Sequence, residues 1–465
     1  MTMGKSVLFV RNIKRTDNYA VPHLGLALLC AALKSRGHRP AVLDYLLFLG
    51  KRPPGLREII SKFRPDVLAM SLYTSTIGES VNFLREFKKL LDIPVIVGGP
   101  HATLYAEELT SNRIGDYIIK GEAEVIISDI VEKAACQETP RIIDAPRPDM
   151  MKDILLPDFR YFLNYENIRV YPLQTSRGCP YLCSFCAVRC LAGQTWRKRD
   201  IKACLGELML ARTYLSRLRV VKIVDDAPTV DRDRFKDFLK DYISEDIGLE
   251  MIIDNVRADS VDEELVALAK RAHNRSLCIA VEHADPDIFK SIGKSESLGQ
   301  IEKAAESIKK AGLNLGLCFI IGLPGDNFER TIKSVRFAKE LKADFIYWNM
   351  VHPMKCTEIR DCFIKEGATL YPDDNYTSFD CHTLKSPRVV VETDDFPAEE
   401  RKRAYFAASV FTGQYHLNIR EIYYLIKYGL RYKLLKSAIL SFVERMVKLR
   451  KYLNPYYITH FIIHS

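Results

Sequence analysis

Three cysteines, Cys179, Cys183 and Cys186, lie within eight residues, directly after a run with the pattern of a strand. Their C-x3-C-x2-C spacing is too compact for a zinc site, which normally joins two C-x2-C pairs that are far apart in the chain. Iron–sulfur clusters, in contrast, are commonly bound by thiolates from one short loop. A cluster of four irons with only three protein thiolates leaves one iron free. The spacing therefore predicts an iron–sulfur centre with an open iron where chemistry can occur.

Other interpretations of the cysteines also fit the sequence. Cys190 follows Cys186 by four residues, so a closed site with four thiolates, holding zinc or a cluster, is an alternative in which Cys190 is a ligand. Cys356, Cys362 and Cys381 suggest an auxiliary cluster, but the first two are six residues apart and do not share a helical face. A free cysteine is often simply a small buried apolar residue. We interpret four cysteines in this way, because they fall on predicted helices or strands: Cys30, Cys204, Cys278 and Cys318.

The elements that must position the cysteine loop alternate between strand and helix from residue 166 to 385. Apolar runs predict strands at 170–175, 220–224, 250–253, 277–281, 315–321 and 345–349. Amphipathic stretches predict helices near 201–214, 232–244, 262–273, 298–311, 328–341 and 357–365. Six such units predict a partial (β/α)6 barrel of the TIM type, with its site at the carboxyl ends of the strands. The cysteine loop follows the first strand, so it falls at that end.

Residues 1–145 show the same alternation and predict a doubly wound parallel sheet, with strands at 7–10, 41–43, 67–70, 95–97 and 117–119. The helices are expected at 24–34, 79–91 and 122–135. Such sheets bind ligands beyond the carboxyl ends of their strands, and glycines there let a bulky ligand approach the backbone. The candidate contacts at these ends are Leu24, Gly25, Ser71, Thr74, Gly98, Gly99, Pro100, His101, Gly121 and Glu122. Residues 146–165, rich in proline at their start and without periodicity, are expected to form a linker.

The stretch from Leu173 to Ala187, with Phe185 just before the last cysteine, resembles the signature loop of the radical S-adenosylmethionine (SAM) enzymes. The resemblance implies that SAM chelates the open iron of a [4Fe–4S] cluster and is cleaved reductively to a 5′-deoxyadenosyl radical. It also implies four SAM contacts, at Phe185, Glu282, Leu323 and Pro324, and no catalytic side chain beyond the cluster ligands. His283 stands where relatives often have Ser. Asp225 and Asp226 follow the second barrel strand, where a turn or a helix N-cap is as good an explanation as a ligand contact.

The pattern over residues 1–145 resembles the cobalamin-binding domain that precedes many radical SAM enzymes, which implies that the ten strand-end residues given above contact cobalamin. The classical Asp-x-His-x-x-Gly motif is absent, since Val21 stands two residues before His23 and Leu26 three after it. The resemblance therefore implies a cobalamin without a lower His ligand, and we interpret His101 as a hydrogen-bonding loop residue. The same fold without cobalamin is the alternative.

The remaining residues, 395–465, have a purely helical pattern, with helices expected at 398–415 and 420–452. The chain has 465 residues and a formal net charge of +9, and its apolar content of 48% is typical of a folded protein. Nine Lys or Arg against two Glu between residues 414 and 465 place most of the excess charge in this tail. We favour a tail that covers the open side of the barrel. A basic aromatic helix also suits peripheral contact with the inner face of an anionic membrane, whereas the lack of a stacking platform disfavours nucleic acid.

Twelve cysteines with uneven spacing are too sparse for a disulfide scaffold, so reduced thiols and a cytoplasmic location are expected. The start of the chain lacks the pattern of a secretory signal. The longest apolar run near the start, Leu24 to Leu33, is about half as long as a membrane span requires.

Together the two regions resemble the class B radical SAM methyltransferases, which use cobalamin to methylate an unactivated carbon. This implies a [4Fe–4S] cluster, SAM and cobalamin as cofactors, a small-molecule or lipid-like substrate, and an electron donor of the flavodoxin or ferredoxin type. An alternative keeps both cofactors but forms a ring or changes a carbon skeleton, as the anaerobic porphyrin cyclases do. The tRNA methylthiotransferases need three further cysteines in the first domain, where only Cys30 and Cys136 are available. A non-catalytic cobalamin-binding protein has no need of an open iron.

Overall fold

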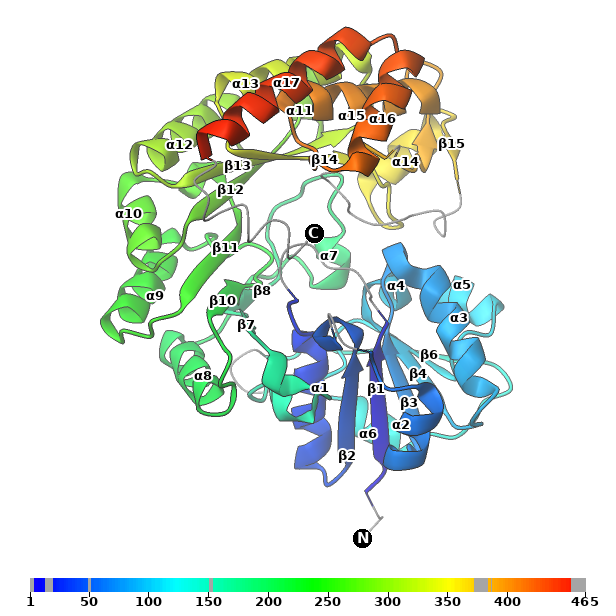
Figure 1. The fold of residues 1–465 in the computed structure, drawn as a ribbon. Helices are drawn as coiled ribbons and strands as arrows, with labels where there is room; N and C mark the ends of the chain where they lie inside the picture. Colours follow the sequence, from blue (N-terminus) through cyan, green and yellow to red (C-terminus); the bar gives the residue numbers. More distant parts are fainter. Residues whose placement is uncertain are drawn as a thin grey trace.

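Two six-stranded parallel sheets organise the chain in a computed structural model, which describes residues 4–12, 20–48, 52–149, 154–371, 384–385 and 387–452. The predicted fold class is confirmed: a doubly wound sheet comes first, a partial barrel follows, and helices end the chain (Figure 1). In Figure 1 the first sheet lies at the lower right, the barrel sheet curves around the left and top, and helix α7 lies between them.

The first sheet has the order β2-β1-β3-β4-β5-β6, so its strand order reverses beside β1 and β3. Except for the last, its strands are short buried runs rich in Val, Ile and Leu, as expected where helices cover both faces. The strands are β1 (Ser6–Arg11), β2 (Arg39–Asp44), β3 (Val67–Ser71), β4 (Val95–Gly98), β5 (Tyr117–Lys120) and β6 (Arg141–Asp144). Its helices are α1 (Leu24–Ser35), α2 (Leu56–Phe63), α3 (Ile77–Lys88), α4 (Gly99–Leu104), α5 (Ala106–Ser111) and α6 (Ile127–Lys133). The sequence did not predict β6, because that strand is largely exposed at the edge of the sheet and lacks a continuous apolar run.

The barrel sheet has the order β14-β13-β12-β11-β10-β7, and all its pairings are parallel. Its strands are β7 (Val170–Leu173), β10 (Val220–Ile223), β11 (Glu250–Val256), β12 (Ser276–Glu282), β13 (Asn314–Ile321) and β14 (Phe345–Met350). The helices are α8 (Ile201–Tyr214), α9 (Arg232–Ser244), α10 (Glu263–Arg271), α11 (Pro286–Ser291), α12 (Leu298–Lys310), α13 (Phe328–Glu340) and α14 (Glu358–Lys365). Several begin at an N-cap whose side chain accepts a backbone N–H of the first turn, which is why the sequence marks their starts well: Asp200, Asp231, Asp262, Ser297 and Asn327.

Short elements surround the cysteine loop. The two-residue strands β8 (Ser176–Arg177) and β9 (Arg197–Lys198) pair antiparallel, and the single helical turn α7 (Val188–Leu191) lies between them in the chain. A second small pair, β15 (Thr369–Leu370) and β16 (Val391–Glu392), follows the barrel.

The second half of the expected linker is tightly packed. Phe159 and Phe162 are almost fully buried in one apolar cluster that contains residues of both sheets, including Val42 and Tyr171. The Leu163 N–H donates to Val42 O at 2.8 Å, which ties this segment to the edge of the first sheet. The two parts of the chain therefore share a core, and their strand ends are held in a fixed relation.

The C-terminal helices are α15 (Ala398–Thr412), α16 (Ile419–Arg431) and α17 (Leu435–Tyr452). α15 packs on α13 and β14, whereas α17, within the stretch that we expected to cover the open side of the barrel, packs on α15 and α16. Arg401 of α15 is buried and donates to Gly322 O at 2.8 Å, which fixes the end of β13. The single helix predicted over 420–452 is wrong: the chain turns at Tyr432–Leu434, where Lys433 has φ of 58°, and α16 and α17 form a hairpin. None of the described helices is both long enough and apolar enough to cross a bilayer.

Candidate functional site

The cysteine loop leaves the carboxyl end of β7 through Gly178, whose φ of 89° favours glycine. A Cβ at this position would lie 2.4 Å from Thr195 O. The Gly178 N–H donates to Asp226 Oδ2 at 2.8 Å. Further along, the Ser184 N–H donates to Ile292 O at 2.9 Å, and Ser184 O accepts the Ile359 N–H at 3.2 Å. Three different barrel segments therefore hold the loop backbone in place.

The thiols of Cys179, Cys183 and Cys186 are free and half-buried. Burial raises the pKa of all three, and that of Cys186 to about 11. Cys179 adds to the raised pKa of Cys183 and of Cys186, and Cys183 adds to that of Cys186, because neighbouring thiolates repel one another. Backbone N–H groups of Tyr181 and Val188 oppose this by bonding to Cys179 and Cys186.

These properties fit a cationic cluster, which removes the thiol protons on binding and supplies the charge that the site lacks. No three His, Cys, Asp or Glu side chains of the described residues converge tightly enough to hold a single metal ion. A four-iron cube attaches each thiolate to a different iron, so it does not require such convergence.

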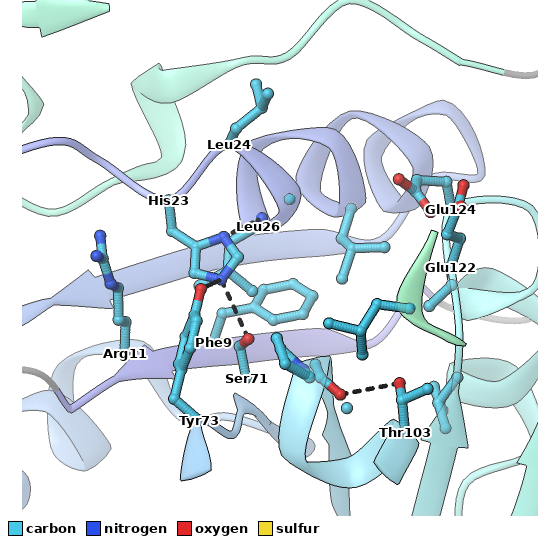
Figure 2. A pocket seen from close by; sticks show the side chains of 18 of the residues that line it. Phe9, Arg11, His23, Leu24, Leu26, Ser71, Tyr73, Thr103, Glu122 and Glu124 are labelled. Carbon is cyan, nitrogen blue, oxygen red and sulfur yellow. Dashed lines mark hydrogen bonds between the residues drawn. The ribbon is translucent and has the colours of Figure 1, made fainter. Parts of the chain in front are cut away.

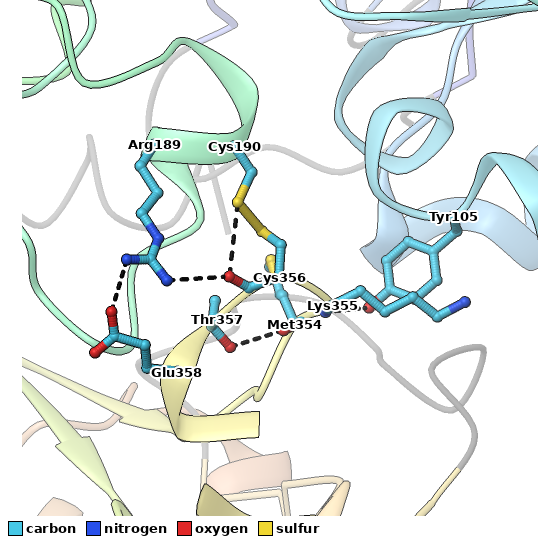
Figure 3. The surroundings of a disulfide bond; sticks show 8 residues. All are labelled: Tyr105, Arg189, Cys190, Met354, Lys355, Cys356, Thr357 and Glu358. Atoms are coloured by element: carbon cyan, nitrogen blue, oxygen red, sulfur yellow. Dashed lines mark hydrogen bonds and ion pairs between the residues drawn. A yellow bond between two sulfur atoms is a disulfide. The ribbon is translucent and has the colours of Figure 1, made fainter. Parts of the chain in front are cut away.

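Cys190 is joined to Cys356 by a disulfide that spans 166 residues of sequence (Figure 3). The expectation that all the thiols are reduced is therefore wrong for this pair. Cys190 is not a free fourth ligand in this structure, and Cys356 is not free for an auxiliary cluster; Cys381 lies outside the described residues. Beside the disulfide, Arg189 pairs with Glu358 at 2.7 Å, so the end of the cysteine loop is fastened to the segment after β14.

The residues expected to contact SAM come together around the loop. Glu282 ends β12 with φ of 68°, and its buried carboxylate raises the pKa of Cys183 and of Cys186. Burial in turn raises the pKa of Glu282, although Lys294, 4.0 Å from Oε1, lowers it. Phe185 packs in one apolar cluster with Leu323, and Pro324 follows, half-buried.

Two polar residues at the strand ends serve the fold. Asp225 is buried and accepts from the Thr175 N–H at 2.6 Å, the Thr175 hydroxyl at 2.7 Å and the Ser176 hydroxyl at 2.6 Å. His283 accepts the Asp285 N–H at its Nδ1, so its Nε2 carries the proton and donates to Asp326 at 3.2 Å. Asp225 therefore fixes a turn, and His283 fixes the end of β13.

A cavity of about 510 Å³ lies between the strand ends of the two sheets (Figure 2). Eight of the ten residues predicted to contact cobalamin line it: Leu24, Gly25, Ser71, Gly98, Gly99, Pro100, Gly121 and Glu122. Thr74 and His101 do not line it, because the buried His101 hydrogen-bonds Thr74 at 3.1 Å. Gly99 has φ of 89°, and a Cβ there would meet Ser71 Oγ at 2.5 Å, so the turn depends on glycine. The glycines in this wall of the cavity leave room for a bulky ligand to approach the backbone.

The first-domain wall of the cavity includes His23, a neutral hydrogen-bonded group that was not among the predicted cobalamin contacts. His23 accepts the Leu26 N–H at Nδ1, so its Nε2 carries the proton and faces the Tyr73 hydroxyl at 2.9 Å and Ser71 Oγ at 3.1 Å (Figure 2). Burial lowers the pKa of His23 to about 3, and the charge of Arg11 adds to this. Both ring nitrogens are therefore occupied, and His23 offers no lone pair to a metal.

An ion network that the sequence also did not reveal joins the two parts of the chain at the same cavity. Arg177, two residues before Cys179, pairs with Glu122 at 2.6 Å and with Glu124 at 2.8 Å. Arg197 pairs with Glu122 as well. All four side chains are largely buried. The network links the loop after β5 directly to the start of the cysteine loop.

Comparison with known proteins gives matches over both parts of the chain. Residues 11–131 match the B12 binding domain, and residues 173–338 match the radical SAM superfamily. An uncharacterised methyltransferase of Pyrococcus horikoshii is 24% identical over 79% of this chain and 84% of the relative. The anaerobic magnesium-protoporphyrin IX monomethyl ester cyclase of Rubrivivax gelatinosus is 23% identical over 73% of this chain, which spans 65% of the cyclase.

Among solved structures, the radical SAM methyltransferase TsrM of Kitasatospora setae, with cobalamin and a [4Fe–4S] cluster bound, superimposes with a TM-score of 0.68. The match covers 96% of this chain and 100% of TsrM at 15% identity, and it establishes the shared fold.

The chain thus joins a B12-binding domain to a radical SAM domain, as the sequence predicted. Its cofactors are the three that these domains use, namely cobalamin, a [4Fe–4S] cluster and SAM. It is a cobalamin-binding radical SAM enzyme, and the relatives that it resembles include a methyltransferase and a cyclase.

Proposed function

We propose that this enzyme transfers a methyl group to an unactivated carbon of a small-molecule or lipid-like substrate. The observation that carries the proposal is the cavity shared by the two domains. Its walls include Ser71 and Gly99 of the first domain and Gln174 and Asp226 of the barrel. A methyl carrier and a radical source must face one substrate atom, and a single cavity between both cofactor domains supports that arrangement.

We assign the cofactors to the residues that were predicted from the sequence. Cys179, Cys183 and Cys186 hold the cluster, and SAM lies against Phe185, Glu282, Leu323 and Pro324. Cobalamin lies in the cavity against the eight lining residues given above. When bound, the cluster with SAM supplies the means to activate an inert C–H bond, and cobalamin supplies a carrier for the methyl group.

The chain's own residues orient these groups and keep water away from them. His23 and Tyr73 present a neutral, already bonded wall to the first-domain side of the cavity. The network of Arg177 with Glu122 and Glu124 fixes the distance between the two domains, because both carboxylates lie on the first domain and the arginine starts the cysteine loop. An electron donor of the flavodoxin or ferredoxin type supplies the reduction that SAM cleavage requires.

Ring formation is the second candidate, and the similarity to the magnesium-protoporphyrin cyclase over 73% of this chain favours it. The two candidates differ in the fate of SAM. Methyl transfer converts SAM to S-adenosylhomocysteine, whereas radical chemistry alone yields 5′-deoxyadenosine.

The test uses anaerobically reconstituted enzyme with cobalamin, a chemical reductant and SAM labelled in its methyl group. We expect corrinoid absorbance in the purified protein and both S-adenosylhomocysteine and 5′-deoxyadenosine among the products. 5′-Deoxyadenosine alone would favour the ring-forming candidate. A protein that binds no corrinoid would overturn the methyl transfer and leave the radical chemistry standing.

A further inference from the structure

The hairpin of α16 and α17 carries a row of exposed apolar side chains, here called the outer face. On α16 they are spaced by four, three and four residues, which places them on one side of the helix. Their exposed fractions range from 47% to 88%, high for Ile, Leu, Val and Met. The outer face consists of Ile419, Tyr423, Ile426 and Leu430 on α16 and Ile439, Leu440, Val443 and Met446 on α17.

The outer face is not the side that attaches the hairpin to the protein. Leu425 and Tyr428 of α16 and Tyr432 just after it are buried, and both tyrosine rings contact Phe406 of α15. Ala438 of α17 is fully buried in the same cluster. Figure 1 shows α16 and α17 at the top of the molecule, near α13 and α15. The buried residues attach the hairpin to α15, so the outer face is a second apolar surface that is exposed to solvent.

The charges around the outer face are almost all positive. Glu444 is the one exposed acid of residues 419–446, because Glu421 is buried and accepts the Leu384 N–H. Arg431 forms an ion pair with Glu399 of α15, with 2.5 Å between Nη2 and Oε2. The exposed basic residues are Arg420, Lys427, Arg431, Lys433 and Lys436. Lys427 lies over the Tyr423 ring, 5.5 Å from its centre, so cationic and apolar groups occupy the same surface.

We propose that the outer face binds the surface of an anionic phospholipid bilayer. A helix of this kind places its apolar side chains at the boundary of the acyl region while Lys and Arg contact the lipid phosphates. The exposed Ile, Leu, Val and Met side chains favour a bilayer over nucleic acid, which is bound by basic grooves and aromatic stacking. This inference concerns where the protein acts, and it holds whether or not the proposed methyl transfer is right.

The test is flotation of the full-length protein with vesicles of mixed phosphatidylglycerol and phosphatidylcholine, compared with pure phosphatidylcholine. We expect binding to the anionic vesicles, and a marked loss of binding as salt is raised, because salt screens the attraction of the lysines and arginines. Ile426→Ser combined with Leu430→Ser should weaken the partition coefficient about tenfold. Lys427→Gln and Lys433→Gln should each weaken it about fivefold.

The matched control is Met209→Ser combined with Leu210→Ser, because these residues of α8 are 42% and 51% exposed, and α8 packs on β7, at the opposite end of the barrel sheet from β14. This control should bind like the unchanged protein. The lysine variants keep the test decisive if the apolar variant fails to fold, which circular dichroism would reveal.

Three results would overturn the proposal. The first is a failure of the protein without substitutions to float with anionic vesicles. The second is binding that survives both sets of outer-face substitutions, since the lipid contact would then lie elsewhere, residues 453–465 included. The third is a dimer in light scattering that the apolar variant dissociates, which would make the outer face an interface between two copies.

Discussion

The first-domain wall of the cavity, here called the first-domain end, and the cysteine loop, here called the cysteine end, keep their titratable groups neutral in opposite ways. At the first-domain end, burial lowers the pKa of His23 to about 3, and each ring nitrogen already has a partner. At the cysteine end, burial raises the pKa of Cys186 to about 11 and raises that of Glu282 as well. His23 has its hydrogen-bond partners without a ligand, whereas Cys186 and Glu282 need a nearby cation in order to ionise.

This difference indicates two modes of binding. The first-domain end offers shape, glycine turns and satisfied hydrogen bonds, so a large neutral surface can lie against it at little electrostatic cost. The cysteine end holds thiols that are protonated until a cation binds, so it gains most from a cationic cluster and from SAM, whose sulfonium is positive. We expect changes at the two ends to have separable effects, and the following variants test that separation.

Cys183→Ala should have the largest effect, because it removes one of three thiolates from a site with no spare ligand. We expect formation of 5′-deoxyadenosine to be abolished, with iron content reduced, while corrinoid absorbance persists. Cys362→Ala is the control, since this thiol of α14 is not in a disulfide and donates to Glu366, outside the cysteine loop. Normal SAM cleavage by Cys183→Ala would refute the assignment of the cluster.

Gly99→Ala tests the opposite end. The new Cβ would lie 2.5 Å from Ser71 Oγ on a backbone with φ of 89°, so the turn after β4 must shift. We expect corrinoid binding, titrated by absorbance, to weaken about tenfold, an effect of about 1.4 kcal/mol. SAM cleavage should continue. In the same domain, Gly78→Ala adds a Cβ with no atom within 4 Å and should leave binding unchanged; equal losses in both variants would contradict the role of the Gly99 turn.

Arg177→Gln breaks the connection between the two ends. It leaves Glu124 buried without its arginine and deprives Glu122 of one of two partners, so we expect a loss of about 3 kcal/mol in the free energy of unfolding by urea. Arg189→Gln removes a more exposed pair with Glu358 and should cost no more than about 1 kcal/mol. Similar losses in the two variants would show that the buried network does not hold the domains together.

The sequence predicted the barrel and the cysteine loop well, because both depend on local patterns. The strands are buried apolar runs, the helices begin at polar caps, and the three cysteines are neighbours in the chain. β6 and the turn at Lys433 were missed, because an exposed edge strand has no apolar run and a lysine with positive φ gives no signal.

Contacts between distant residues were the part that sequence could not supply. Arg177 is 55 residues from Glu122, and nothing in either segment marks the other as its partner. Likewise, the pairing of Cys190 with Cys356 cannot be chosen from twelve cysteines by spacing. His101 stood beside a glycine pair and looked like a candidate, but its ring turns to Thr74, and His23 lines the cavity instead.

His23→Gln should change the pH dependence of the free energy of unfolding, and this effect should be smaller than the loss expected for Arg177→Gln. Above pH 6.5 the imidazole is neutral in both the folded and the unfolded chain. Between pH 6.5 and about 3 the unfolded chain binds a proton that the folded chain does not, so stability falls as pH falls, by up to about 1.4 kcal/mol per unit.

Urea unfolding at pH 7 and pH 5 measures this slope. We expect the unchanged protein to lose about 2 kcal/mol more than His23→Gln between these two values. His416→Gln, at an exposed histidine, should keep the original slope. Parallel slopes for the unchanged protein and His23→Gln would mean that His23 is not held neutral at the first-domain end.

Cys190→Ser should have the smallest effect, and it bears on whether the cysteine end holds three thiolates or four. In the structure Cys190 is bonded to Cys356, so its loss removes a cross-link and no cluster ligand. We therefore expect iron content and 5′-deoxyadenosine formation to stay unchanged, and the peptide that joins residues 190 and 356 to vanish from non-reducing mass spectra. Cys356→Ser breaks the same bond and is the matched control. A loss of iron in Cys190→Ser but not in Cys356→Ser would assign Cys190 to the cluster, close the fourth iron, and remove the site where SAM must bind.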